Sequence, residues 1–330
     1  MPDPDENLTA DVFTLEQVGF ALEELAVCPN CAKSNGPDRA NCLYCGKPLP
    51  ATGKNANSDA IAFRRLEAWE PGINLILNNR NVAAKSTAAV SQILGIEPEE
   101  FTAIVESKTP IPIARVEDEQ TAELIAARLG DLGFETSRIS DRLLDADHPP
   151  IRIRSAAIEN EQIIFTDFNS GGSYAIALED VNLVVTGRIY LSRREEVTKR
   201  KGGATKVLDE FQTSGDLGIA DLYSSKDFVG FRIQTNGFDF SVLGDDKELL
   251  AARNMAKLIH VLTDTAPNGI LADEYDSIRK HLDIVWEPEK SKDHHGLQIR
   301  GYGKREFGAT YTSSNLVQFT KYSRMRRLMI

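Results

Sequence analysis

The hydrophobic pattern between residues 72 and 140 changes from the period of a strand to that of helices and back. Apolar residues occupy every second position from Ile73 to Leu77 and predict a strand, because alternate side chains of a strand share one face. Runs with helical spacing follow, and Gly95 and Gly133 end two of them. The pattern predicts three strands and three helices in the order β-α-α-β-α-β, over residues 73–77, 82–94, 97–106, 111–114, 118–132 and 136–139.

Residues 151–290 carry a strand-rich pattern. Short apolar runs separated by turn signals predict antiparallel strands, and Asn236-Gly237 is a good two-residue hairpin turn. The predicted strands start at Ile151 and continue over residues 162–166, 174–178, 181–191, 218–223, 228–234 and 238–243. A helix over residues 247–262 closes this β domain, and a shorter helix-like piece follows over residues 275–282.

Other segments flank or connect these regions. Residues 14–25 have the spacing of a short amphipathic helix, and small polar residues mark a linker before the first strand. Residues 141–150 form the next boundary, and a polar tail ends the chain in a basic stretch. We therefore expect a multidomain α+β protein, with parts at residues 1–50, 51–71, 72–140, 151–290 and 291–330.

The four cysteines are clustered in one short segment. Cys28 and Cys31 form one C-x2-C pair, and Cys42 and Cys45 form a second pair, which Gly46 follows. Each pair can form a tight turn that points both sulfur atoms at one ion, and Gly46 can adopt the positive φ that supports such a turn. Four thiolates suit tetrahedral Zn²⁺. We predict a structural zinc site with these four ligands; iron or a redox dithiol is the alternative.

Residues 46–49 complete a C-x2-C-G-x-x-L knuckle, and residues 27–50 resemble the zinc-ribbon (rubredoxin-like knuckle) family. A segment of this size cannot bury enough apolar area to fold alone, so the metal would supply its folding energy. Four thiolates leave no open position for water, which argues against a catalytic zinc. The few cations of the ribbon, Lys33, Arg39 and Lys47, favour protein contact or a structural role over nucleic-acid binding.

The stretches VAAKSTAAVSQILGIEPEEFTAIVES and TPIPIARVEDEQTAELIAARLGDLGFETSRI lie within residues 82–139. They resemble the C-terminal domain of the bacterial ribosomal stalk protein and the N-degron protease adaptor that shares its fold. The adaptor's acidic binding residue has no counterpart, because Asn79 and Arg80 stand at that place, and the lysine-rich helix of the stalk domain has only Lys85 here. We therefore expect an interaction module with a different partner.

The strands and closing helix of residues 151–290 resemble the pleckstrin-homology-like superfold in architecture. Binding of a lipid head group there would need a basic pocket. One cluster of cations is available, and it consists of Arg188, Arg193, Arg194, Lys199, Arg200, Lys201 and Lys206. This cluster is either a solvated hairpin tip or a surface for an anionic ligand or lipid.

The chain of 330 residues has a formal net charge of −11 and a pI of about 5.1. This charge disfavours nucleic acid and anionic lipid as partners unless a local basic patch acts against it. The acidic start of the chain lacks the features of a secretory signal, and no apolar run is long enough to span a membrane. We therefore expect a cytoplasmic protein, and the clustered cysteines agree with that compartment.

The sequence has five histidines, His148, His260, His281, His294 and His295. We expect His148 in a solvated loop and His260 within a helix, while Asp293, His294 and His295 form a loop cluster that could take a second metal. The sequence contains no motif of a hydrolase, a phosphate-binding loop or a zinc protease. We expect no catalysis, because every thiol is assigned to the metal. The alternative is an enzyme whose site in the C-terminal half includes His281 or the His294–His295 pair.

These features predict a non-catalytic zinc-binding protein that acts through protein–protein interaction, in the manner of a scaffold or adaptor. As a whole the arrangement resembles bacterial zinc-ribbon proteins of uncharacterised activity. One alternative is a nucleic-acid- or ribosome-associated factor that uses the ribbon and the basic tail, where Arg324, Arg326 and Arg327 lie. Another is membrane-surface binding through residues 188–206. The sequence leaves the partner and the oligomeric state open.

Overall fold

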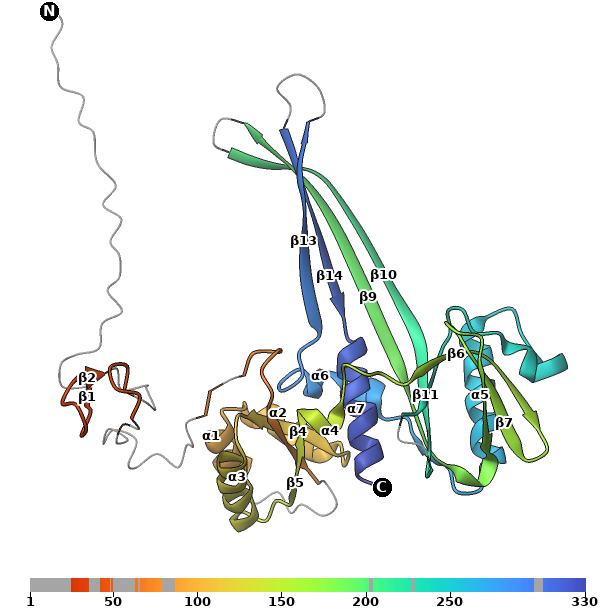
Figure 1. The fold of residues 1–330 in the computed structure, drawn as a ribbon, viewed down its shortest axis with the longest axis horizontal. Coiled ribbons are helices and arrows are strands. Elements are labelled where there is room, and N and C mark those ends of the chain that lie inside the picture. Colours follow the sequence, from red (N-terminus) through yellow and green to blue (C-terminus); the bar gives the residue numbers. More distant parts are fainter. Residues whose placement is uncertain are drawn as a thin grey trace, which may run out of the picture. The chain divides into compact units, whose positions relative to one another are not determined.

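The computed structural model describes residues 25–35, 42–47, 49, 63–64, 66–78, 87–201, 204–226, 229–299 and 305–330; for residue 26 and the described residues within 196–214 and 295–307 it gives the backbone only. The chain divides into two compact units, Met1–Ile61 and Ala62–Ile330 (Figure 1). The predicted mixture of helices and strands is confirmed. The predicted helix over residues 14–25 lies outside the described residues. The predicted linker 51–71 is too long, because Leu66 within it is already buried.

A three-stranded sheet with helices forms the first part of the second unit. In chain order its elements are β3 (Ile73–Leu77), α1 (Thr87–Leu94), α2 (Pro98–Glu106), β4 (Ile111–Val116), α3 (Glu119–Asp131), β5 (Thr136–Ser140) and the short α4 (Asp141–Leu144). The strand order is β4-β3-β5, and β3 is antiparallel to both neighbours. Up to β5 the elements follow one another in the order β-α-α-β-α-β.

Signals close by in the sequence determine where these helices begin and end. Gly95 and Gly133 have φ values of +67° and +87°, and each lies just after a helix, as predicted. The Asp118 carboxylate accepts a hydrogen bond of 2.8 Å from the Thr121 N–H and so caps α3. The same N–H group lowers the pKa of Asp118.

Residues 141–150, predicted as a domain boundary, instead hold the small sheet together. The Asp141 carboxylate accepts hydrogen bonds from the Gly72 N–H at 2.8 Å, from the Asn74 amide at 2.9 Å and from Arg115 Nε at 2.8 Å. Arg115 and Asp141 are both largely buried, so the pair is shielded from water. The segment that follows β5 is therefore part of the fold and not a linker.

The rest of the second unit is built on a nine-stranded sheet. Its strands are β6 (Ile151–Glu159), β7 (Gln162–Asp167), β8 (Ser173–Ala177), β9 (Val181–Lys201), β10 (Ala204–Ser224), β11 (Phe231–Gln234), β12 (Ile270–Ala272), β13 (Glu289–Ile299) and β14 (Arg305–Ser314). The order is β13-β14-β9-β10-β11-β6-β7-β8, and β12 also pairs with β9. Because β11 pairs with β6 and β12 with β9 in parallel, the prediction of an antiparallel domain is wrong, and the sheet is mixed.

Strands β9 and β10 are much longer than predicted. Each has 21 residues, whereas the sequence pattern ended the first at residue 191 and began the second at residue 218. Beyond Leu191, β9 is also paired with β14, and β14 is paired with β13. These four strands form one layer, the arm, which consists of residues 191–201, 204–215, 289–299 and 305–314 (Figure 1).

One predicted strand, over residues 238–243, is a 3₁₀ helix instead. This element, η3, extends over Phe240–Asp246. The Asp239 carboxylate accepts a hydrogen bond of 3.0 Å from the Ser241 N–H, which favours a helical start over a strand. The turn before it is retained, since Gly237 has a φ of +82°.

The predicted closing helix is present as α5 (Ala251–Thr265). It buries Leu258 and Leu262 in the same core as residues of β6, β7 and β11. In that core Phe165 and Phe231 stack with 5.0 Å between their ring centres. A hydrophobic core of the unit therefore lies between α5 and the sheet.

The predicted polar tail, residues 291–330, is folded. It supplies most of β13, all of β14 and the helix α7 (Leu316–Leu328). Phe319 of α7 is fully buried, and the ring of Tyr275 from α6 (Tyr275–Leu282) packs on it edge to face at 5.0 Å. The tail therefore packs on the body of the protein.

The regions predicted as separate domains, 72–140 and 151–290, belong to one compact unit. Trp286 Nε1 donates a hydrogen bond of 2.8 Å to Asn74 Oδ1, and both side chains are buried. This bond connects the small sheet directly to the segment after α6.

Replacing Trp286 with phenylalanine is expected to lower the free energy of unfolding by about 1–3 kcal/mol, because the buried Asn74 oxygen loses its donor. Urea unfolding followed by circular dichroism measures the change. Trp69→Phe is the matched control, since Trp69 is 81% exposed and should tolerate the change. Equal stability of the two variants would contradict the role of the bond.

Candidate metal centre

The two C-x2-C segments form two turns of the same construction. In the first turn the Cys28 N–H donates to the Lys33 carbonyl, and the Ala32 N–H donates to the Cys28 carbonyl. In the second turn the Cys42 N–H donates to the Lys47 carbonyl, and the Gly46 N–H donates to the Cys42 carbonyl. These bonds measure 3.0 and 2.8 Å in the turn that begins at Cys28, and 2.8 and 2.9 Å in the turn that begins at Cys42. The short strands β1 (Ala26–Val27) and β2 (Ser34–Asn35) pair antiparallel around the first turn.

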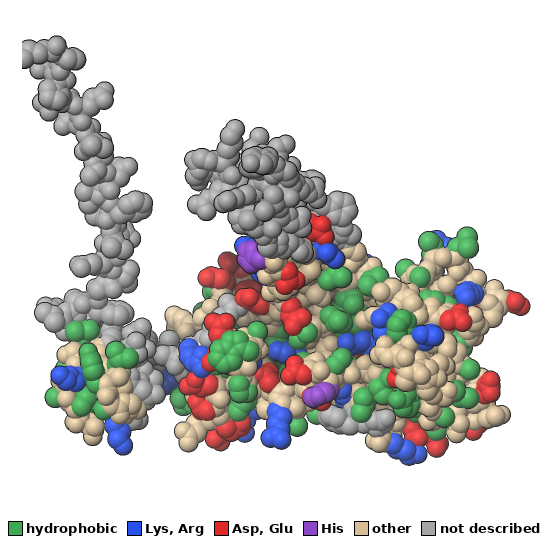
Figure 2. Space-filling model, turned by 45° about the horizontal axis from the view of Figure 1, so that its top comes forward, with side chains coloured by type: hydrophobic (Ala, Val, Ile, Leu, Met, Phe, Trp, Pro, Cys, Tyr) green, Lys and Arg blue, Asp and Glu red, His purple; other side chains and the backbone are tan. Residues whose placement is uncertain are grey.

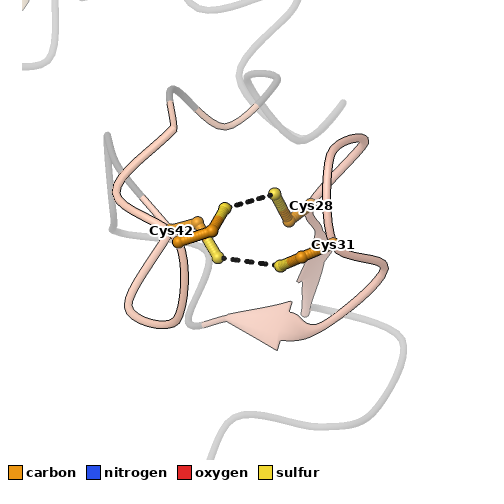
Figure 3. A group of neighbouring side chains, drawn as sticks. Cys28, Cys31 and Cys42 are labelled. Carbon is orange, nitrogen blue, oxygen red and sulfur yellow. Dashed lines mark hydrogen bonds between the residues drawn. The ribbon is translucent and has the colours of Figure 1, made fainter.

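The turns bring all four predicted ligands together. The sulfur atoms of Cys28, Cys31, Cys42 and Cys45 lie within 4.8 Å of one another. Cys28 Sγ is 3.6 Å from Cys45 Sγ, and Cys31 Sγ is 3.5 Å from Cys42 Sγ (Figure 3). A tetrahedron with metal–sulfur bonds of about 2.3 Å has edges of about 3.8 Å. The cluster could therefore bind a metal ion with little movement.

A side chain that the sequence analysis did not single out supports this cluster. Asn35 is buried, and its Nδ2 donates to Cys42 Sγ at 3.5 Å and to the Lys33 carbonyl at 2.8 Å. Its Oδ1 accepts a hydrogen bond of 2.8 Å from the Leu43 N–H. Asn35 thus connects the two turns, and a single asparagine gives no sequence signal of such a role.

The thiols do not ionise independently. Burial opposes ionisation of Cys42, but backbone N–H groups of the turn outweigh it and lower the pKa of that thiol to about 6. The Lys47 N–H lowers the pKa of Cys45. The Lys33 N–H acts in the same direction on Cys31, but burial and the neighbouring sulfurs raise the pKa of that thiol to about 12. Neighbouring thiolates repel one another, so all four ionise together only around a cation.

The two turns differ at one backbone position. Gly46 has the positive φ expected from the sequence, +69°, while the equivalent residue of the first turn, Ala32, takes φ +54° with a side chain. Nothing lies within 4 Å of a Cβ built on Gly46, so a substitution there would test the backbone conformation alone.

We expect Gly46→Ala to weaken and Ala32→Gly to strengthen the affinity for added Zn²⁺, each about fivefold, because a left-handed conformation costs a non-glycine residue about 1 kcal/mol. Competition with a chromophoric chelator measures the affinities. Equal affinities of both variants and the natural protein would contradict the expectation.

The surface around the cysteines is apolar. Val27, Leu43 and Tyr44, the ribbon patch, are exposed by 56, 64 and 62%. Lys33 Nζ lies 5.9 Å from the centre of the Tyr44 ring. Figure 2 shows hydrophobic and basic side chains on the surface of this unit. Aromatic side chains and contiguous exposed apolar patches are common at docking surfaces.

The histidines do not gather into a site in the described part of the chain. His148 is exposed, as predicted, and the Asp145 carboxylate 2.7 Å away raises the pKa of its ring. His260 is exposed on α5. His294 belongs to β13 and not to the predicted loop, and the side chain of His295 lies outside the described residues. Among the residues described, only the cysteines form a group of three or more that could share an ion.

The predicted basic cluster of residues 188–206 is only partly described. Arg188 Nε lies 2.7 Å from the Asp276 carboxylate, and Arg193 lies 2.8 Å from that of Glu195. The side chain of Arg194 is also described. The structure does not describe the side chains of the other four members, Lys199, Arg200, Lys201 and Lys206. The described members therefore contribute to contacts within the protein.

The basic end of the chain is used for internal contacts. Arg324 is buried, and Arg326 Nη1 lies 3.0 Å from the Glu274 carboxylate. Arg327 Nη2 donates to the Ser224 carbonyl at 3.0 Å. These arginines therefore belong to the packed helix α7 and not to a polar tail.

An open groove of about 790 Å³ lies between β9, β10 and α5. Its walls are mostly apolar, and Asp216, Asp273 and Asp276 contribute carboxylates to it. Asp276 is paired with Arg188, as described above. The described residues that line the groove include no histidine, so the groove does not contain the histidines that the enzyme alternative invoked.

No model of a known protein family, no curated protein and no solved structure matches this chain. None of the described helices combines the length and the apolar character that crossing a membrane requires. The cysteine cluster with its surroundings is therefore the feature from which a function is best inferred.

Proposed function

We propose that the chain is a non-catalytic zinc-binding protein that docks another protein on its ribbon, in the manner of an adaptor or scaffold. One observation carries this proposal: four cysteines gathered around one point lie beside the exposed residues Val27, Leu43 and Tyr44. A metal held by four thiolates has no open position for a substrate, so the useful part of such a unit is its surface.

Zinc is the ion we propose, because four thiolates in a tetrahedron are a common structural zinc site and zinc itself is redox-inert. The proposal places the protein in the cytoplasm, where thiols stay reduced and available to a metal. The partner would offer an apolar surface to the ribbon patch and an acidic group to Lys33, which lies beside the Tyr44 ring.

The βααβαβ part and the strand-rich part would serve as further docking surfaces. Their likeness to the stalk-protein domain and to pleckstrin-homology-like domains belongs to this proposal and supplies no partner. The exposed Trp69, near the start of the small sheet, is one side chain available for such a contact.

The experiment compares three tagged full-length proteins expressed in the native host: the natural chain, Leu43→Ser/Tyr44→Ser, and the control Leu249→Ser. Leu249 is fully exposed on the second unit, so its replacement removes a similar apolar surface elsewhere. Quantitative mass spectrometry measures the co-purified proteins, and elemental analysis measures the metal in each preparation.

We expect one zinc per chain in all three proteins. At least one partner should be retained by the control and reduced tenfold or more by the patch variant. Retention of every partner by the patch variant would contradict docking on the ribbon, while iron in place of zinc would contradict the metal assignment.

A further inference from the structure

The groove between β9, β10 and α5 lies where the hydrophobic core beneath α5 ends. Val184 of β9 and Ala220 of β10 belong to that core. Two residues nearer the arm on each strand, Thr186 and Gly218 line the groove instead. Alternate residues of a strand share one face, so the groove continues the surface on which the core is packed. A Cβ built on Gly218 would lie 3.6 Å from Met255 Cγ, so the missing side chain leaves space beside α5.

The first half of α5 forms an apolar wall of this groove. Ala252, Ala256 and Ile259 are separated by four and three residues, so they share one face of the helix, and all three line the groove. Ala252 and Ala256 are exposed, and Ile259 is partly buried. From Ala251 to Ile259 the wall is about 12 Å long at 1.5 Å per residue. This length corresponds to about four residues of an extended chain.

The groove has more carboxylates than cations. Asp216, Asp273 and Asp276 line it, and Arg188 is the one cation among the described residues that do so. Asp276 accepts hydrogen bonds of 2.7 Å from the backbone N–H and from Nε of Arg188. This pair, with a smaller contribution from Asp216, raises the pKa of Arg188. Within the described part of the chain neither Asp216 nor Asp273 forms an ion pair, so the groove keeps an excess of negative charge.

Shape and charge together indicate what this groove binds. A small-molecule site usually encloses most of its ligand, whereas this groove is open to solvent. A segment of another protein can lie across an open groove, with aliphatic side chains on the α5 wall and cations beside the carboxylates. The net charge of −11 would attract such a basic segment to the protein and would repel nucleic acid and anionic lipid.

We propose that the groove between β9, β10 and α5 docks a short segment of a partner protein that combines aliphatic side chains with lysine or arginine. This surface lies on the second unit and is separate from the ribbon patch. It also selects a different chemistry, because the ribbon patch would take an acidic group beside Lys33. The two surfaces would therefore hold two different segments.

The test measures binding of fluorescent hexapeptides to the full chain by fluorescence anisotropy at 50 mM salt. The peptides have neutral ends, and each contains four residues chosen from alanine, valine and leucine and two chosen from lysine and arginine. We expect saturable binding by members of this set. Glutamate in place of the two cations should abolish it, and serine in place of the aliphatic residues should weaken it tenfold or more.

Two variants test the groove itself. Asp216→Asn/Asp273→Asn removes the two carboxylates and should weaken peptide binding about tenfold, since exposed ion pairs contribute modestly. Ala256→Leu fills the space beside the wall and should weaken binding tenfold or more. The matched controls are Glu97→Gln/Glu106→Gln and Ala127→Leu, which make the same changes at exposed positions of the small-sheet part. Both controls should bind like the natural protein.

The outcomes separate this proposal from docking on the ribbon. Leu43→Ser/Tyr44→Ser, which changes the ribbon patch, should bind the hexapeptides as the natural protein does. Equal binding by groove and control variants, or no binding of any hexapeptide at 1 mM, would overturn the proposal. Equal binding of the glutamate peptides would also overturn it. So would self-association of the chain that Ala256→Leu abolishes, because the groove would then hold a second copy. If Ala256→Leu fails to fold, the aspartate variant decides on its own.

Discussion

Replacing Cys42 with serine is expected to abolish stoichiometric zinc binding and to unfold the ribbon, while the unit Ala62–Ile330 stays folded. In the described part of the ribbon only Cys28, Asn35 and Cys42 are buried, so no apolar core would replace the metal. Structural zinc sites contribute about 10–16 kcal/mol of folding free energy, far more than a single hydrogen bond. Serine also replaces the sulfur atom that accepts the Asn35 hydrogen bond with a smaller hydroxyl oxygen.

Elemental analysis and hydrogen exchange, read separately for each unit, measure this outcome. Tyr44→Ser is the matched control, since Tyr44 lies in the same turn and exposes 62% of its surface. It should keep one zinc and a protected ribbon. Removal of zinc from the natural protein with a chelator should reproduce the effect of Cys42→Ser. A Cys42→Ser protein with a full equivalent of zinc and unchanged exchange in the ribbon would show that the metal is not held by these cysteines.

The features that could be predicted from the sequence are those set by residues near each other along the chain. The spacing of Cys28, Cys31, Cys42 and Cys45 was sufficient to predict their convergence, because a short turn determines where both sulfur atoms of a pair point. Gly133 likewise marks the end of α3 through its positive φ. Such local signals do not depend on the rest of the fold.

The burial of α7 could not be predicted from its polar composition. Gln318 is buried because its Nε2 donates to the Trp286 carbonyl at 2.7 Å. Ser323 is buried because its hydroxyl group lies 2.8 Å from that of Tyr223, 100 residues earlier. A hydropathy pattern assigns such residues to the surface, since it cannot include partners that only the tertiary fold brings near.

The hydrophobic pattern of the sequence also could not predict which distant strands pair with each other. β11 joins β6 in parallel, with Phe231 opposite Ile151, although the apolar runs of both strands fit an antiparallel arrangement equally well. The strands of the arm were not predicted from the sequence, because they are rich in charged residues. These residues reduce the alternation of apolar and polar positions that indicates a strand.

Replacing Asp221 with alanine is expected to destabilise the second unit by about 3–5 kcal/mol, because it leaves a buried guanidinium without its partner. Asp221 is fully buried, and both of its oxygens lie 2.7 Å from Arg232 nitrogens. Arg232 also donates to Thr320 of α7 at 3.0 Å. Burial opposes the charge of Arg232, but the Asp221 carboxylate outweighs it and raises the pKa of Arg232.

The measurement is the thermal midpoint of unfolding, which should fall by about 10 °C for a loss of this size. Lys226→Met is the matched control: it breaks the Lys226–Asp180 pair, whose lysine is 73% exposed, and should cost less than about 1 kcal/mol. Replacing both partners, Asp221→Leu with Arg232→Met, should restore most of the loss, since neither unpaired charge then remains buried. A double variant less stable than Asp221→Ala would contradict this expectation. The attraction within the Asp221–Arg232 pair, and not the cost of an unpaired buried charge, would then be the source of the stability. The pair would hold α7 to the sheet through that attraction.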